Sequence, residues 1–110
     1  MRLLGFSFPI RFESFLNKIN DVSSYEIPNT SITLYSFNYI EERNLTYEIQ
    51  EYEPDFIMIG QDGDMGYFLK NDGNEFIYSN DLGAIGSSEM EIVSINIDDF
   101  IENQELCSDD

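Results

Sequence analysis

Apolar and polar residues follow each other along this chain in patterns that predict first a helix and then a sheet. Between residues 8 and 20, apolar positions recur at spacings that place them on one face of an amphipathic helix. The residues of this apolar stripe are Phe8, Phe12, Phe15, Leu16 and Ile19. Pro9 suits the first helical turn, with Ser7 or Phe8 as the cap, and Asn20-Asp21 is expected to end the helix. We expect the stripe to pack into the core and not to form a binding groove.

The clearest strand pattern lies in the middle of the chain. Short apolar segments at 56–59, 67–70 and 75–79 are separated by clusters of Gly, Asn and Asp. Such segments are typical of a β-meander, in which each strand pairs with the next. The continuous apolar run at 56–59 predicts a central strand covered on both faces. The polar clusters at 60–66 and 71–74 are expected to be the turns, the second a tight hairpin turn.

The segments before this meander give weaker patterns. Residues 21–30 predict a polar connector, and the alternation in 31–37 predicts a strand. Asn38 is a suitable cap for a short helix at 38–44. For residues 45–54 two alternatives stay open, an irregular helix-to-strand link or a weak edge strand.

The segments after the meander predict a flexible loop at 80–88, a final strand at 90–95 and a short helix at 96–102. Asn96 is expected to cap this helix, and acidic Asp98 and Asp99 lie in its first turn, where the helix dipole favours negative charge.

Together these elements predict an α+β fold, with a twisted, mostly antiparallel sheet and N-terminal and C-terminal helices packed beside it. The length of 110 residues fits one domain, which we place at residues 1–104, followed by an acidic, frayed tail at 105–110. Hydrophobic residues make up 42% of the chain, including nine Phe and seven Tyr, which is enough for a core and argues against global disorder. No apolar run approaches membrane-spanning length.

Charge changes this picture most. The chain has 22 acidic and 5 basic residues, so its formal net charge is 5 − 22 = −17. Such a surface repels nucleic acids and anionic membranes and attracts cationic partners. Two explanations of this charge stay open: it keeps the protein soluble, or it serves to bind a dedicated basic partner. We predict a partner-binding surface from the acids of the expected turns and of the middle helix: Glu41, Glu42, Asp62, Asp64, Asp72, Glu75 and Asp81.

Residue types for catalysis are scarce. The chain has no His, and Cys107 is its only cysteine, which suits a reducing cytoplasm and leaves no internal disulfide. The usual hydrolytic triads are therefore absent, and we expect no enzyme activity, catalytic residue or cofactor. The segment 60–66 lacks the Gly-Lys-Ser/Thr of a phosphate loop. As a calcium loop it lacks the closing Glu, whose place Gly73 takes, so we predict no metal site.

Four segments, in the same order along the chain, resemble the SUKH superfamily, also called the Smi/Knr-like domain. Residues 8–21, Phe-Pro-x-x-Phe-x-x-Phe-Leu-x-x-Ile-Asn-Asp, are similar to its opening helix, and 32–36 are similar to its Leu-Tyr-Ser segment. Residues 56–69, which contain Ile-Gly-x-Asp-Gly-x-x-Gly, resemble its glycine-rich core. Residues 97–101, Ile-Asp-Asp-Phe-Ile, resemble its closing helix.

This resemblance implies an α+β fold and a non-enzymatic binding role. Bacterial members are typically immunity proteins that neutralise polymorphic or contact-dependent toxins, many of them nucleases, and fungal members are regulatory scaffolds. This chain departs from the pattern at Asp21, where Gly is common, and at Asp64 and Met65, which interrupt the glycine run. We expect a cytoplasmic immunity protein that binds a basic, nuclease-type toxin domain. The alternative is a regulatory or scaffold domain without a toxin partner.

Overall fold

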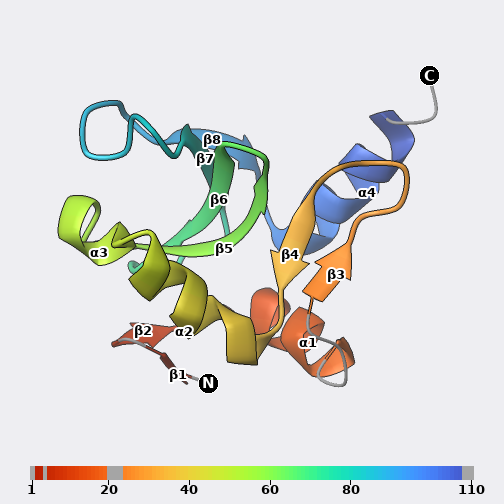
Figure 1. Cartoon of the computed structure of the whole chain (residues 1–110). Coiled ribbons are helices and arrows are strands. Elements are labelled where there is room, and N and C mark those ends of the chain that lie inside the picture. Colours follow the sequence, from red (N-terminus) through yellow and green to blue (C-terminus); the bar gives the residue numbers. More distant parts are fainter. Residues whose placement is uncertain (1, 4, 20–23, 108–110) are drawn as a thin grey trace.

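The chain folds around a six-stranded antiparallel sheet whose strands follow chain order. The computed structural model in Figure 1 describes residues 2–3, 5–19 and 24–107. The strands of the large sheet are, in order, β3 (Ser24–Glu26), β4 (Thr33–Tyr35), β5 (Phe56–Asp62), β6 (Met65–Lys70), β7 (Ile77–Asp81) and β8 (Glu91–Ser94). This arrangement confirms the predicted α+β fold with a mostly antiparallel sheet, and β5 to β8 form the predicted meander.

Four helices cover the sheet: α1 (Ile10–Lys18), α2 (Phe37–Thr46), α3 (Ile49–Tyr52) and α4 (Ile97–Cys107). In Figure 1, α2 lies below β5 and α3 to its left, and α4 lies behind the loop between β3 and β4. On one face of the sheet, Tyr67 of β6 packs on Phe100 of α4, with ring centroids 4.9 Å apart. Gln61 of β5 points to the opposite face, toward Tyr47 at the end of α2. The helices therefore cover the sheet from both sides, α4 and α1 on one and α2 and α3 on the other.

Helix α1 buries the predicted apolar stripe. Phe12 is 1% exposed and Leu16 2%, and the other members of the stripe are buried as well. Pro9 is the N-cap, not a residue of the first turn, and its carbonyl accepts a hydrogen bond from the Glu13 amide at 2.9 Å. The helix ends at Lys18, and the predicted stop at Asn20-Asp21 lies outside the described residues.

Strand β5 is longer than predicted. Its first residues confirm the central strand, since Ile57, Met58 and Ile59 are fully buried. The expected seven-residue turn at 60–66 is wrong, because only Gly63 and Asp64 separate β5 from β6. The physical reason is that glycine here permits close packing within the sheet: a Cβ at position 60 would lie 2.6 Å from the carbonyl oxygen of β4.

Three short strands have no signal in the sequence pattern. The predicted polar connector contains β3, which pairs antiparallel with β4. The N-terminal strands β1 (Arg2–Leu3) and β2 (Phe6–Ser7) form a separate two-stranded sheet. Strands of two or three residues are too short for periodicity to reveal. Strand β3 is held by tertiary packing, since Tyr25 contacts Phe15 of α1 with ring centroids 5.8 Å apart.

The middle of the chain is more helical than predicted. The expected strand at 31–37 is limited to β4, and α2 begins at Phe37, where the Phe37 ring packs edge-on against Phe8. The open alternatives for 45–54 resolve to the helical link, because α2 continues to Thr46 and α3 follows. Glu48 connects the two helices in a left-handed conformation with φ 53°.

Helix α4 begins as predicted and ends later. The Asn96 side-chain oxygen accepts a hydrogen bond from the Asp99 amide at 2.8 Å, which confirms the expected cap. The helix continues to Cys107, so the backbone of 105–107 is helical. The rest of the predicted tail, residues 108–110, lies outside the described residues.

Candidate protein-binding surface

Three of the predicted partner-binding acids meet at one end of the sheet. Asp62 lies opposite Met65, and Met65 lies opposite Asp81. Two of the acids, Asp62 and Asp81, therefore lie in one row across β5, β6 and β7, with Met65 between them. Asp64 lies in the turn beside them, and its carbonyl accepts a hydrogen bond from the Leu82 amide at 2.7 Å. We call Asp62, Asp64 and Asp81 the acidic end of the meander.

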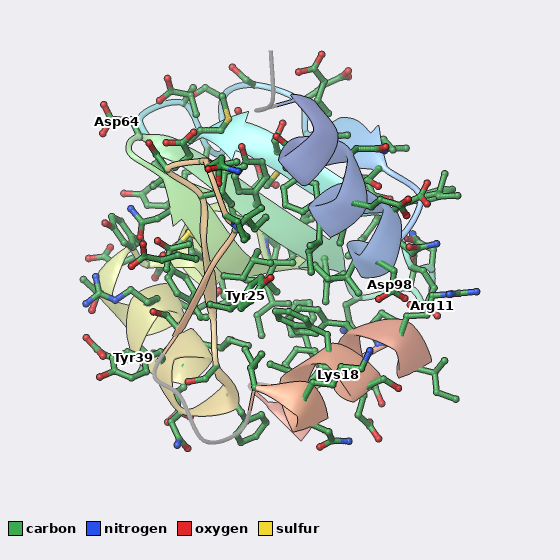
Figure 2. All side chains as sticks on the ribbon, turned by 90° about the vertical axis from the view of Figure 1, so that its right-hand side faces the viewer. Arg11, Lys18, Tyr25, Tyr39, Asp64 and Asp98 are labelled. Atoms are coloured by element: carbon green, nitrogen blue, oxygen red, sulfur yellow. The ribbon has the colours of Figure 1, made fainter. Side chains whose placement is uncertain are left out.

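Local backbone geometry presents these carboxylates outward. Gly63 has φ 58° at the first central position of the turn, as a type II′ hairpin requires. Asp64 and Asp81 are exposed, and Figure 2 shows Asp64 at the edge of the molecule, far from α1. The Asp81 carboxylate accepts one hydrogen bond, from the Gly83 amide at 2.7 Å, which fixes its orientation. The acidic end is therefore a short, ordered projection with negative charge on it.

Asp62 acts electrostatically on its neighbour in the sheet. The pKa of Tyr67 is raised, first by burial of the ring and second by the negative charge of Asp62. Tyr67 lies opposite Gly60 and Met65 lies opposite Asp62, so the half-buried Asp62 is on the same face of the sheet as Tyr67, the face that α4 covers. Its negative charge is therefore less screened by water than that of the exposed Asp64.

Asp72 and Glu75 do not join this group. They lie in the loop between β6 and β7, at the other end of β6, which is about 17 Å long at roughly 3.3 Å per residue. The Asp72 carboxylate accepts a hydrogen bond from the Asn74 amide at 3.0 Å and thereby shapes its own loop. Glu75 is half-buried.

The two glutamates of α2 lie on a different surface. Glu41 and Glu42 are exposed, and the Glu42 carboxylate accepts a hydrogen bond from the Arg43 guanidinium at 3.1 Å. The Arg43 side chain also lines a small polar cavity of about 280 Å³ whose wall includes Gly63 of the hairpin turn. Glu41 and Glu42 thus belong to α2, an element that does not carry the acidic end.

A polar network beneath the acidic end had no signal in the sequence. The Tyr35 hydroxyl donates a hydrogen bond to the side-chain oxygen of Gln61, and the Gln61 amide donates to the Gly63 carbonyl at 3.0 Å. The pKa of Tyr35 is strongly raised, mainly by burial and then by Tyr47, while the positive charge of Arg43 opposes the shift. These residues are distant in sequence, so only the pairing of β4 with β5 reveals them.

An open groove of about 420 Å³ lies between α1, β3 and α4. Its walls are Phe15, Ile19, Tyr25 and Ile101, with charged Lys18, Asp98 and Glu102. Figure 2 shows Arg11 and Asp98 side by side at its edge, where their charged groups are 3.4 Å apart. Both side chains are more than half exposed, so this pair adds little to stability.

Within residues 2–3, 5–19 and 24–107, no three side chains of the metal-binding types converge on one point. None of the helices in that part of the chain is long and apolar enough to cross a membrane.

Comparisons with known proteins add no family assignment. No protein-family model matches this chain, and no curated protein matches it. The resemblance to the SUKH superfamily therefore stays a prediction from the ordered segments quoted above. The partner-binding role of the seven acids likewise stays a prediction.

Proposed function

We propose that this protein is a non-enzymatic immunity protein that binds and neutralises a cationic, nuclease-type toxin domain. The observation that carries the proposal is the charge of −17, together with the grouping of Asp62, Asp64 and Asp81 on one projecting end of the sheet. The ordered resemblance to the SUKH superfamily supports the same role. We place the protein in the cytoplasm, where a nuclease toxin would meet its substrate.

The physical basis is electrostatic complementarity. A nuclease holds a polyanion in a cleft lined by Lys and Arg. A protein with many carboxylates on its surface competes with the nucleic acid for this cationic cleft. Long-range attraction raises the rate of encounter, and it weakens as salt screens the charges. The acidic end has a suitable form for entering such a cleft, because Asp62 and Asp64 lie at the tip of the β5–β6 hairpin and Asp81 lies beside this tip at the end of β7. In this proposal the immunity protein blocks access of nucleic acid to the toxin.

Co-expression with the toxin-like protein encoded by the reading frame next to this gene tests the proposal. We expect cells that produce the toxin domain to survive only when this chain is produced as well. A triple variant, Asp62→Asn, Asp64→Asn and Asp81→Asn, should protect less at equal expression. A toxin that kills equally with and without this chain would refute the proposal, as would a neighbouring frame that encodes no toxin.

A further inference from the structure

Four exposed apolar side chains gather at the outer strand of the sheet. The residues are Phe76, Ile92, Val93 and Ile95, with exposed fractions of 37%, 56%, 41% and 58%, and we call them the apolar corner. Among the described residues, the other large exposed apolar side chains lie on α1, α2, α3 and β6: Ile10, Tyr39, Leu45, Tyr52 and Met65. Single exposed apolar residues are ordinary, but a contiguous group marks an interaction surface.

The pairing of β7 with β8 brings Phe76, Ile92 and Ile95 together, and Val93 follows Ile92 in the same strand. Ile92 lies opposite Tyr78, and the Phe76 ring packs edge-on against the Tyr78 ring with centroids 6.4 Å apart. Ile77 lies opposite Ser94, which brings Phe76 and Ile95 to the same end of the two strands.

Half-buried groups support the corner at Tyr78. The Phe56 ring supports Tyr78 at 5.1 Å, and the Asn74 side chain donates a hydrogen bond to the Tyr78 hydroxyl at 3.1 Å. A partner would therefore meet an ordered surface and lose little side-chain entropy on this side of the interface.

Strand β8 is the last strand of the sheet, and no described strand pairs with its outer edge. Its register shifts beside Ile77 and Tyr78, and the strand has only four residues. Short length and bulges are features that hinder the addition of a further strand to an edge. Contacts of side chains, and not a continued ladder of backbone hydrogen bonds, are thus the means of binding that this corner offers.

The charges around the corner select the kind of partner. Glu75 precedes Phe76 and Glu91 precedes Ile92, and the exposed Glu89 lies just before β8. A second copy of this chain would bring another charge of −17 and the same acids against this rim. Repulsion of like charges disfavours that pairing, whereas Lys or Arg beside apolar groups would complement the rim.

We propose that the apolar corner is the docking surface for the cationic partner, which presents apolar side chains flanked by Lys or Arg. This inference rests on the proposed function and adds a second contact region to the acidic end. The two regions have separate tasks. Exposed carboxylates at the acidic end speed the encounter, and burial of the apolar corner slows dissociation.

Binding kinetics of the purified full chain with the toxin-like domain from the neighbouring frame test this division. We expect the double variant Ile92→Thr, Val93→Thr to raise the dissociation rate at least tenfold and to leave the association rate within about twofold. The matched control is Ile10→Thr, an isoleucine that is 77% exposed on α1, which should change neither rate. Thermal melting of both variants should match that of the unmodified chain.

The outcomes separate the two proposals. If the unmodified chain binds and the double variant dissociates at the same rate, the corner is not the docking surface, while the proposed function stands. If the unmodified chain does not bind the toxin-like domain, both proposals fail. A dimer of the chain alone at high salt, abolished by the double variant, would assign the corner to a second copy and overturn the inference.

Discussion

The side chain of Asn44 pairs with the backbone of Met58 as a strand residue would. Its oxygen accepts a hydrogen bond from the Met58 amide at 2.8 Å, and its nitrogen donates to the Met58 carbonyl at 2.9 Å. The same nitrogen donates to the Ile40 carbonyl at 2.7 Å within α2. Strand β4 pairs with β5 only at Gly60 and Gln61, so Asn44 continues the edge of β5 where β4 is absent. One buried amide thereby joins α2 to the central strand.

Replacement of the Asn44 side chain should lower the stability of the fold. In Asn44→Ala, two buried backbone groups of Met58 lose their partners, and we expect the free energy of unfolding to fall by about 3 kcal/mol. Chemical denaturation would measure the loss. Asn38→Ala, at an exposed position of the same helix, is the matched control and should change it by less than about 0.5 kcal/mol. Equal effects of the two substitutions would show that Asn44 has no special role.

Substitution of Gly60 tests the close packing of β4 on β5. A Cβ there would lie 2.6 Å from the Thr33 carbonyl oxygen and 2.8 Å from a methyl carbon of Leu34. Because a backbone oxygen cannot move aside cheaply, Gly60→Ala should lower the unfolding free energy by about 3 kcal/mol. Gly83→Ala meets only the flexible Asp81 carboxylate, at 3.2 Å, and should be nearly neutral. A Gly60→Ala protein as stable as the unmodified chain would contradict this packing.

The sequence predicted those elements whose pattern arises from the burial of neighbouring residues. The stripe that includes Phe12 and Leu16 has helical spacing because one face of α1 is buried, and the apolar run at 57–59 is continuous because helices cover both faces of β5. These features depend on a few neighbouring residues. The α+β fold class and the meander follow from them.

The remaining features depend on pairs that are distant along the chain. Strand β3 exists because Tyr25 packs on Phe15, and no periodicity encodes that contact. The grouping of Asp62 with Asp81 needs the exact register of three strands, so the sequence indicated acids in turns without showing which turns meet. Asp72 belonged to the same predicted set and lies at the far end of β6.

Alkaline pH should reveal the burial of Tyr35. Its folded-state pKa lies above the unfolded value of about 10, so the neutral hydroxyl contributes stability that is complete below pH 10. That stability is lost as the pH rises from the unfolded pKa toward the folded one. Between about pH 8 and about pH 11, Tyr35→Phe should therefore lose less unfolding free energy than the unmodified chain. Identical slopes for Tyr35→Phe and the unmodified chain would count against the expectation.

The position of the acids, beyond their number, should govern association with the cationic partner. The triple variant Asp62→Asn, Asp64→Asn, Asp81→Asn should lower the association rate about tenfold at low salt. A control with the same change in charge replaces three exposed acids in and beside α3: Glu48→Gln, Glu51→Gln and Asp55→Asn. We expect this control to lower the rate by less than about twofold. Equal reductions in stopped-flow measurements would mean that net charge alone matters.

The association rate of the unmodified chain with the toxin-like domain of the neighbouring frame, measured over a range of salt, tests the central claim most directly. We expect a rate that falls at least tenfold between about 0.05 M and about 0.5 M NaCl, because salt screens the attraction between opposite charges. A rate that stays constant or rises over this range would show that no anionic surface guides the encounter, and the proposed electrostatic recognition would be wrong.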